Sequence, residues 1–419
     1  MDRDFDLPTQ YKLDKIDIDG KDVRSLFVKF ALYENIYIPA ITGNIQLLDT
    51  DGAGFIEENE IEFVEDLEVS FTNSLGDVLQ FKGKLNGLKG EMVKESKRLY
   101  SIDFASKHAR KNESTFVTKR FKNVNPEDVV EEMLKDKIGA DKIDIKAQGT
   151  PMNFLGSRRK PFDVIKYVLT HGVTTNSKYS EGQDKEGKAE GTTGFLCWET
   201  LKGYRFASID QLIKGEAGEQ HEGFKKQLQN NNLPMDKVMK GVIDYHFPRI
   251  GNLQDKLRSG ALNNTGVYLD LDKGEYKEIN YFDQENMTEK EKEIATSFTR
   301  VMWKPISNER HNNECEKAQA DTGDQTKKQL QQNVARQNTF DDQQGEFTLP
   351  PRFDINAGDT IEFKLGRVES KREAGYDEKH SGTYCIKSLA HHIFGKGEAY
   401  TKIATVRTNK QQDDASSKQ

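Results

Sequence analysis

The sequence predicts an α+β chain, mainly β, in which two similar β-barrel or β-sandwich domains are separated by helical and mixed α/β segments. The first observation is that residues 11–110 alternate apolar and polar residues in short runs, with Gly, Asn and Asp between the runs. Such alternation indicates strands with one buried face. The second is that the same kind of pattern returns over residues 346–407. The third is that the stretch between these regions carries start and stop signals for helices.

Composition limits the class of protein. A chain of 419 residues is long enough for about two to four domains and for a sizeable core. Charged residues make up 31% and the formal net charge is -7, but no long block of Lys and Arg occurs. Binding driven by nucleic-acid phosphates needs clustered positive charge, so the composition disfavours it. An acidic wall, past which nucleic acid slides without binding, remains compatible with this charge.

Cysteine spacing and hydropathy bear on the compartment. Cys197, Cys315 and Cys385 are far apart and odd in number, and no Cys-x-x-Cys motif occurs. This pattern predicts free thiols in a reducing compartment rather than a disulfide framework or a zinc site. No apolar run approaches roughly 18 residues, and the opening MDRDFDLPTQ has no apolar segment. We therefore expect neither a signal peptide nor a membrane span.

Two helices are expected between the β regions. In NVNPEDVVEEMLKDKIG, Pro126 suits the first helical position and Gly139 suits the end of the helix. RKPFDVIKYVLTHG repeats this arrangement, with Pro161 near its start and Gly172 at its end. The segment 174–194 is polar and Gly-rich, which predicts a flexible loop, and GFLCWETLKGYRFASIDQLI after it predicts a hairpin.

These signals divide the chain into domains. We assign residues 1–120 to a first β domain, 121–235 to an inserted α/β domain with two helices, a hairpin and the flexible loop 174–194, 236–260 together with 346–408 to a second β domain, 261–345 to an inserted mixed segment, and 409–419 to a disordered tail. The stretch 307–345 is rich in Asn, Gln and charged residues, so it is not expected to form a core.

The two β regions share an order of features. NEIEFVEDLEV is followed by a Gly-containing strand and by RLYSIDFAS, and GDTIEFKLGRV is followed by SGTYCIKSLAHHI and YTKIATVRT. Ile61-Glu62-Phe63 and Ile361-Glu362-Phe363 occupy corresponding places in this order. We interpret the order as an internal duplication of a β domain, with the helices inserted between the copies. A trimer of such a chain would present six similar domains, which could join three-fold and six-fold partners on one axis.

The order of motifs resembles the baseplate hub protein of contractile-tailed, T-even-type phages, and the first part of the related type VI secretion spike protein. The stretches that carry the resemblance are ITGNIQLLDTDG, NEIEFVEDLEVSF, FKGKLNGL, YSIDFAS, NPEDVVEEML, KPFDVIKYVLTHG, GFLCWETLKGYRFASID, LPPRFDINAGDTIEFKL, SGTYCIKSLAHHI and YTKIATVRT. The chain departs from the secretion-spike pattern because its 419 residues include no spike domain. It also departs in two polar expansions, 174–194 and 307–345.

The resemblance implies a structural virion protein without enzymatic activity. It implies a homotrimeric, pseudo-six-fold ring of two tail-tube-like β domains per chain, which adapts a hexameric tail tube to a trimeric central spike. The implied partners are the spike, the tail tube or a tube-initiator protein, the tape measure protein and other baseplate proteins, with no cofactor. DNA would pass through the channel at genome ejection without specific binding. The implied location is the tail baseplate of the virion, assembled in the host cytoplasm, and the alternative is the hub of a contractile secretion system or tailocin.

Two groups of residues are candidates for roles in such a ring. Because negative side chains repel DNA phosphates, an acidic strand could face the channel. Its candidate residues are Glu60, Glu62, Glu68 and Glu362. The candidates for sheet packing or inter-subunit contact are Ile61, Phe63, Ile361, Phe363, Tyr384 and Ile386. The last two share one strand face and Cys385 and Leu389 the other, which predicts a strand covered twice, by the fold and by a neighbouring subunit.

NIQLLDTDGAGFIEENE has a spacing that invites comparison with a calcium-binding loop. Asp49, Asp51 and Glu58 fall at ligand positions if Gly52 takes the sixth position of an EF-hand. Leu47 then stands at the first position, where an oxygen ligand is needed, and the flanking sequence is β-rich rather than helical. We therefore expect a turn between two strands and no metal.

No constellation of residues points to catalysis. The eight histidines are scattered, and the adjacent pair His391 and His392 should point to opposite faces of a strand. No common catalytic motif occurs. The many acidic residues lack an apolar setting that would raise a carboxyl pKa, as a glycoside hydrolase needs. We expect no catalytic residues, and a tail-associated cell-wall hydrolase is the alternative from another class.

Overall fold

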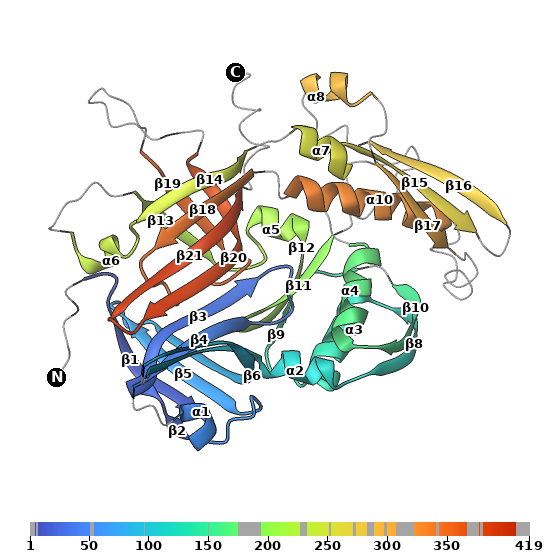
Figure 1. Ribbon diagram of the computed structural model, residues 1–419. Coiled ribbons are helices and arrows are strands. Elements are labelled where there is room, and N and C mark those ends of the chain that lie inside the picture. The colour runs from blue at the N-terminus through green and yellow to red at the C-terminus, as the bar shows by residue number, and fades with distance from the viewer. Residues whose placement is uncertain are drawn as a thin grey trace.

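In the computed structural model, two β units lie against each other and two smaller α/β units lie on one side of them (Figure 1). The structure describes residues 5, 7–50, 54–95, 97–149, 151–174, 194–226, 233–250, 253–270, 274–282, 289–296, 300–306, 322–340, 343–366, 377 and 380–407. The predicted tail 409–419, and the predicted loop 174–194 apart from its two end residues, lie outside the described residues. The fold is α+β and mainly β, as predicted.

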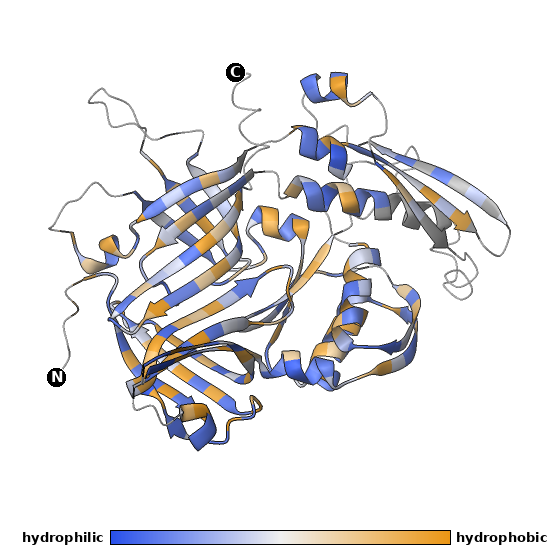
Figure 2. Cartoon of the chain, in the orientation of Figure 1, coloured by the Kyte–Doolittle hydropathy of each residue, from blue (hydrophilic) through white to orange (hydrophobic). Residues whose placement is uncertain are grey.

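The first β unit forms from the strands that the alternating pattern predicts. Its elements are β1 (Tyr11–Ile18), β2 (Lys21–Asp22), a 3-10 turn (Arg24–Leu26), β3 (Phe27–Asn35), β4 (Thr42–Asp49), α1 (Phe55–Glu58), β5 (Asp66–Asn73), β6 (Val78–Lys94), β7 (Lys97–Ser106) and α2 (Lys107–Glu113). In β5, Leu67, Val69 and Phe71 are buried and the residues between them are not, apart from Asn73 at its end. Figure 2 shows this alternation of hydrophobic and hydrophilic residues along the neighbouring strands.

The second β unit has its own core. Its elements are β13 (Gln220–Lys225), α6 (Met235–Val238), β14 (Asp244–Ile250), β18 (Gln343–Leu349), β19 (Thr360–Lys364), β20 (Gly382–Phe394) and β21 (Glu398–Arg407). The rings of Phe347 and Phe363 stack in this core with their centroids 3.9 Å apart, and Tyr384 meets both edge-on. The cores of the two β units are separate clusters of buried residues.

A continuous path of eight strands runs through both β units, in the order β14-β18-β21-β20-β3-β4-β7-β6. At its middle, β20 pairs antiparallel with β3, from Ser388–Asn35 to Phe394–Lys29. β5 pairs with the first part of β6, and β1 and β2 continue the sheet beyond β5. β19 pairs with the first part of β20, and β13 continues the sheet beyond β19. Each β unit therefore contributes four strands to the path and packs its remaining strands across its core.

The two β units have matching strand pairing. The β6–β7 hairpin has a bulge between Leu85 and Gly87, and the β20–β21 hairpin has one between Ile386 and Ser388. Alignment on these bulges matches β3 with β14, β4 with β18, β5 with β19, β6 with β20 and β7 with β21, and each strand then has equivalent neighbours. The pairing is not identical, because β13 is parallel to β19 whereas β1 is antiparallel to β5. The β6–β7 hairpin also has a second bulge, between Leu88 and Gly90. The matched order supports the internal duplication.

The predicted equivalence of Ile61-Glu62-Phe63 with Ile361-Glu362-Phe363 is wrong. The second triplet lies in β19, but the first lies in the turn before β5, where Glu60 and Phe63 have φ values of 52° and 63°. The bulge-aligned register makes Leu67-Glu68-Val69 the counterpart in β5. Two apolar residues around a glutamate occur twice in this short segment, and the local pattern cannot tell which one is in the strand.

The first inserted unit packs helices on two small sheets. Its elements are β8 (Val117–Val124), α3 (Pro126–Glu132), a π-helical turn (Met133–Lys137), β9 (Ile143–Ile145), β10 (Met152–Arg159), α4 (Pro161–His171), β11 (Phe195–Thr200), β12 (Gly203–Ser208) and α5 (Ile209–Lys214). The two predicted helices are confirmed, with Pro126 and Pro161 in their first turns. Gly139 has a φ of 74°, the left-handed conformation that favours glycine at a helix end. β11 and β12 form the predicted hairpin.

The second inserted unit is a three-stranded sheet with helices. Its elements are α7 (Leu253–Ser259), β15 (Asn263–Asp270), β16 (Glu275–Phe282), α8 (Glu289–Ile294), β17 (Val301–Ile306) and α10 (Thr322–Phe340). α10 lies along the sheet, where the Gln331 amide donates to the Tyr268 hydroxyl at 2.7 Å. Within the described part of the chain, no helix combines the length and apolar character needed to cross a membrane.

Two predicted domain boundaries need correction. β13 lies before residue 235, in the segment assigned to the inserted α/β domain, but it pairs with β19 of the second β unit. α7 lies before residue 260, in the segment assigned to the second β domain, but Leu253 and Leu257 pack against the second inserted unit. Both segments are short and rich in polar residues, so their partners are set by tertiary contacts rather than by local pattern.

Candidate assembly surface

One face of the eight-strand path packs on the cores of the β units, and the other face is open. Tyr245, Phe347, Ile403 and Leu389 are aligned across β14, β18, β21 and β20. The last three side chains are at most 2% exposed, so this row faces the core. Because side chains alternate along a strand, the flanking rows point away from the core. We call the face that carries them the open face.

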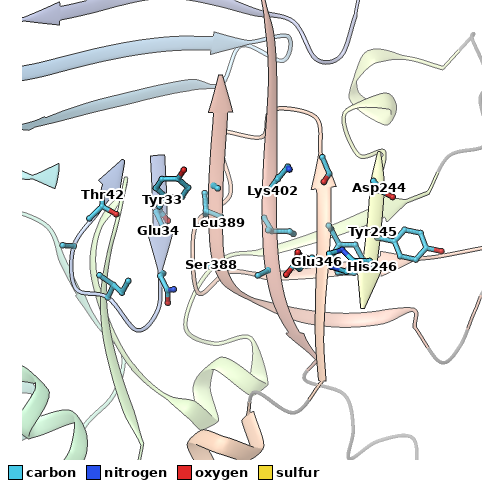
Figure 3. Close-up of a pocket in the computed structure, with 18 residues that line it drawn as sticks. Tyr33, Glu34, Thr42, Asp244, Tyr245, His246, Glu346, Ser388, Leu389 and Lys402 are labelled. Carbon is cyan, nitrogen blue, oxygen red and sulfur yellow. Dashed lines mark ion pairs between the residues drawn. The ribbon is translucent and has the colours of Figure 1, made fainter. Parts of the chain in front are cut away.

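The open face is hollowed where the two β units meet, with a cavity of about 470 Å³ (Figure 3). Its lining comes from six neighbouring strands of the path. The residues of the two flanking rows that line it are Tyr33, Asn35, Thr42, Asp244, His246, Glu346, Thr348, Ser388, Ala390, Lys402 and Ala404. On the central strands β20 and β21 these residues are small except for Lys402, and most of the larger polar ones lie on the strands to either side.

The charges around the hollow are of both signs and well solvated. His246 Nε2 lies 3.5 Å from a carboxylate oxygen of Glu346, and their side chains are 63% and 51% exposed. Lys402 adds a positive charge and Asp244 a negative charge to the lining. An exposed ion pair contributes little to stability. The hollow therefore suits contact with polar side chains and water.

The open face stays polar along the first β unit. The Asn44 amide donates to the Ser101 hydroxyl and to a carboxylate oxygen of Asp103, both at 3.0 Å. Burial, helped by the charges of Lys29 and Lys402, lowers the pKa of His392 to about 4, so this ring is neutral at neutral pH. A long sheet face that is polar and mixed in charge fits exposure to water or to a polar partner.

A buried polar junction holds the two β units and the first inserted unit together. Glu34, on β3, is 1% exposed. Its carboxylate accepts the N–H of Leu201, in the β11–β12 turn, at 2.8 Å and the N–H of Ala357, just before β19, at 2.9 Å. Burial raises the pKa of Glu34 to about 8. One side chain therefore joins three parts of the molecule.

Glu199 forms a second connection of the same kind. It lies on β11 and its carboxylate accepts the N–H of Ile41, which precedes β4, at 2.9 Å. Its other carboxylate oxygen lies 2.6 Å from Nδ1 of His108 in α2. Both partners, Ile41 and His108, belong to the first β unit. The β11–β12 hairpin is thus anchored on the first β unit through polar contacts as well as through packing.

Asp359 anchors the same hairpin to the second β unit. Its carboxylate is fully buried and lies 2.6 Å from Nη1 of Arg205, on β12, and 3.2 Å from Nε2 of His221, on β13. It also accepts the backbone N–H groups of Glu219 and Asn356. Burial alone would raise the pKa of Asp359, but the hydrogen bond from His221 and the charge of Arg205 outweigh it and lower the pKa below its ordinary value.

The segment predicted as an acidic strand begins with a turn rather than with a strand. Glu60 and Glu62 are exposed residues of the turn before β5. Glu68 lies on β5, but its carboxylate bridges Lys15 at 2.5 Å and Lys82 at 2.7 Å. The hydrogen bonds from these two lysines lower the pKa of Glu68 to about 2. Its negative charge is therefore matched by positive charge on the same surface.

The four acidic candidates are not brought together on the open face. Glu362 lies on β19, half-buried, with its carboxylate 3.4 Å from the Lys364 ammonium. β5, which carries Glu68, and β19 are both outside the eight-strand path. A role of these residues in facing a channel stays a prediction.

The predicted packing residues lie in the cores of one chain. Ile61 is buried and Phe63 is half-buried against the first core. The other four are fully buried in the second core: Ile361, Phe363, Tyr384 and Ile386. Their packing is therefore within the chain, and it forms the hydrophobic side of the two β units.

The prediction that a neighbouring subunit covers the second face of β20 needs correction. Leu389 lies in the same core as Tyr384, because the bulge after Ile386 shifts the alternation by one residue. Cys385 faces the other way and packs with Trp198 of the β11–β12 hairpin, in a cluster of buried side chains from the same chain. Both covers of the start of β20 are intramolecular.

The Asp49–Glu58 segment is a connection that contains the short helix α1, rather than a plain turn. The buried Asp49 carboxylate accepts the N–H groups of Gly54 and Phe55, at 3.0 and 2.9 Å, and so satisfies the start of α1. Asp51 and Gly52 lie outside the described residues. In the part of the chain that the structure describes, no three His, Cys, Asp or Glu side chains are grouped as a metal site would need.

His391 and His392 lie on opposite faces of β20, as predicted from strand alternation. His391 is fully buried, and burial lowers its pKa to about 3. Cys197 and Cys385 are buried free thiols, and burial raises the pKa of Cys197 to about 12 and that of Cys385 still further. The two cysteine side chains contribute to core packing, and neither thiol is accessible as a nucleophile. Cys315 lies outside the described residues.

No protein-family model matches the chain, and no curated protein is similar in sequence. Solved structures do match its fold. A 43 kDa tail protein of a prophage from Shewanella oneidensis is 11% identical, with a TM-score of 0.55 over 95% of this chain and 98% of that one. A tail protein from Neisseria meningitidis is 10% identical, with a TM-score of 0.56 over 96% and 97% of the two chains. The chain therefore has the fold of these two tail proteins over nearly its whole length.

Sequence reasoning missed the residues of the polar junction. Glu34, Glu199 and Asp359 stand among many other acidic residues, and Arg205 among many other basic ones. A weak signal was present, because Glu34 directly follows the mainly apolar run SLFVKFALY and Glu199 follows the apolar FLCW. An acidic residue inside a strongly apolar strand is often buried with hydrogen-bond partners.

Proposed function

We propose that the chain is a structural subunit of a phage tail, a baseplate hub that assembles into a ring around a central channel. The observation that carries the proposal is the eight-strand path, which consists of two equivalent four-strand units in one chain. Two equivalent units let a ring of three chains present six similar segments to its neighbours. The fold shared with two tail proteins is consistent with this role.

In this proposal the ring is a homotrimer that adapts a six-fold tail tube to a three-fold central spike. Its partners are the spike, the tail tube or a tube-initiator protein, the tape measure protein and other baseplate proteins. The open face, polar and mixed in charge, would line or border the passage, and DNA would pass without binding specifically. The protein would be located in the virion tail after assembly in the host cytoplasm. A hub of a contractile secretion system or tailocin has the same architecture.

The proposal assigns no catalytic activity to the chain. Glu34 has the raised pKa that a general acid needs, but both its carboxylate oxygens accept backbone N–H groups and it is 1% exposed. Glu34 also lines the hollow of the open face, but both of its oxygens already accept backbone hydrogen bonds, so the proposal treats it as an anchor. Peptidoglycan lysis by the purified chain, abolished by a single Asp or Glu change, would instead support a cell-wall hydrolase.

The solution mass by light scattering, with negative-stain images of the same peak, tests the proposal. The chain mass is 47.8 kDa, so a trimer has a mass of about 143 kDa. Ring-shaped particles with three-fold symmetry at this mass are the expected result. Particles without that symmetry, or a chain that stays monomeric at every concentration, would contradict the ring.

A further inference from the structure

Each four-strand unit of the path begins and ends with equivalent strands, but the chain makes only one of the two possible links between units. β3 begins the first unit and β20 ends the second, and these two strands pair. β14 begins the second unit, and the last part of β6, Leu88–Lys94, ends the first. Within the described ranges, β14 pairs only with β18, and Leu88–Lys94 pairs only with β7.

Apolar residues on the last part of β6 are exposed, whereas their counterparts on β20 are buried by β3. The bulge-aligned register makes Leu88 the counterpart of Leu389. A second bulge in β6, between Leu88 and Gly90, shifts the match by one residue and makes Val93 the counterpart of Ile393. Leu389 and Ile393, on the strand that β3 joins, are 2% and 0% exposed, whereas Leu88 and Val93 are 38% and 61% exposed. Met92, between them, is 66% exposed. An apolar strand edge of this kind is a template for another strand.

We propose that Leu88–Lys94 of one copy pairs antiparallel with β14 of a second copy, as β20 pairs with β3 inside one chain. This inference rests on the proposed ring and names the strands that join its subunits. Carrying the internal register over places Val93 opposite Tyr245 of the partner subunit. It places Lys94 opposite Asp244 of the partner subunit.

The side chains at this register are complementary. Inside one chain the corresponding pair is Phe394 and Lys29, whose ammonium lies 5.4 Å from the ring centroid. Between copies the pair becomes Lys94 with Asp244 of the partner subunit, which have opposite charges. Apolar and opposite-charge pairs directly across two strands both favour antiparallel pairing. The contact is head to tail, so it repeats from copy to copy until the ring closes.

Cysteine cross-linking between two differently labelled chains tests the pairing. In a Cys315→Ser background, one full-length chain carries Lys94→Cys and another carries Asp244→Cys, and the two are mixed with a short bis-maleimide. Covalent dimers in the mixture, and none from either chain alone, are the expected result. The matched control is one chain with Lys29→Cys and Phe394→Cys, the equivalent internal pair, which should cross-link without forming dimers.

Light scattering and images of the same samples separate this inference from the proposed function. Rings that give no cross-link between the two chains would overturn the strand pairing and leave the hub proposal intact. Cross-linked filaments without rings would support the pairing and contradict the hub. A chain that stays monomeric and uncross-linked at every concentration would overturn both. Lys94→Asp should weaken assembly at least tenfold, and the addition of Asp244→Lys should restore it.

Discussion

At the scale of single residues, Glu34 shows how a buried carboxyl group can organise a fold. Its carboxylate gives two backbone N–H groups their partners, one in the β11–β12 turn and one before β19. Without that carboxylate both groups would be buried and unsatisfied. The arrangement has a cost, because burial raises the pKa of Glu34 from 4.5 to about 8.

This raised pKa predicts a pH dependence of stability. The folded protein holds the proton on Glu34 more tightly than the unfolded chain does. The contribution to stability is therefore fully present below about pH 4.5 and is lost as the pH rises toward 8. The free energy of unfolding, measured with urea at several pH values, should fall more steeply over this range in the natural protein than in Glu34→Gln. Identical slopes for the two proteins would show that Glu34 titrates normally in the folded state.

Asp359 provides a second test at this scale. Asp359→Ala should reduce the free energy of unfolding by about 3 to 5 kcal/mol, because it leaves the Arg205 guanidinium buried without its carboxylate. Lys15→Ala is the matched control, since it breaks an ion pair whose partners are both solvated. Denaturant titration of the two variants should show a large loss for the first and little change for the second. Equal losses would mean that the Arg205–Asp359 pair is not an anchor.

At the scale of elements, equivalent strands repeat their steric constraints. Gly43 on β4 and Gly345 on β18 occupy the same register position against β7 and β21. A Cβ at Gly43 would overlap the Phe104 ring and the Ala31 carbonyl oxygen, and a Cβ at Gly345 would press on Phe247 and Phe347. The same residue type at the same place in both units is what a duplicated domain with retained packing would show.

The crowding predicts the effect of adding one methyl group. Gly43→Ala should destabilise the protein by about 1 to 3 kcal/mol, because the surrounding strand and ring have to shift. Gly87→Ala, in β6, is the control, since a Cβ there meets no atom within 4 Å. Thermal unfolding should place Gly43→Ala well below the natural protein and Gly87→Ala close to it. A stable Gly43→Ala would indicate that the strands are less tightly packed here than the structure implies.

At the scale of the whole molecule, the two halves of the eight-strand path are joined by the pairing of β3 with β20, and both ends of the path are open. The open ends are β14 and the last part of β6. Within the described residues, the outer edge of each of these strands has no partner strand, which leaves a row of backbone donors and acceptors available for pairing. Proteins usually protect such edges with charge, with a short strand or with a partner. Here the β6 edge carries exposed Met92 and Val93, which favours a partner.

Placing a charge on this edge should weaken assembly without unfolding the chain. Val93→Asp should weaken self-association at least tenfold, or about 1.4 kcal/mol, because a carboxylate would be desolvated in the contact. Val78→Asp is the control, because Val78 lies on the same strand, is 55% exposed and is outside the proposed link. Analytical ultracentrifugation measures the association, and circular dichroism checks that both variants remain folded. Equal effects of the two changes would contradict a specific role of the β6 edge.

The sequence predicted well whatever depends on local patterns. The helices beginning at Pro126 and Pro161, and the β11–β12 hairpin, follow from residue spacing and from proline and glycine positions. It predicted poorly whatever depends on a partner strand. Glu60 and Glu62 belong to a segment that alternates like a strand, but they lie in a turn. β13 has a polar sequence, but it pairs with β19 and extends the sheet.

The amino-acid sequence by itself determined the α+β class, the repeated order of motifs in the two β regions and the composition that disfavours phosphate-driven binding of nucleic acid. Only the tertiary structure decided that Leu67-Glu68-Val69, rather than Ile61-Glu62-Phe63, matches Ile361-Glu362-Phe363. It also decided that Glu34 is buried, and that Val93 is exposed where its counterpart Ile393 is covered. The physical reason is that alternation and helix signals act over a few residues, whereas strand register, bulges and burial depend on segments hundreds of positions apart.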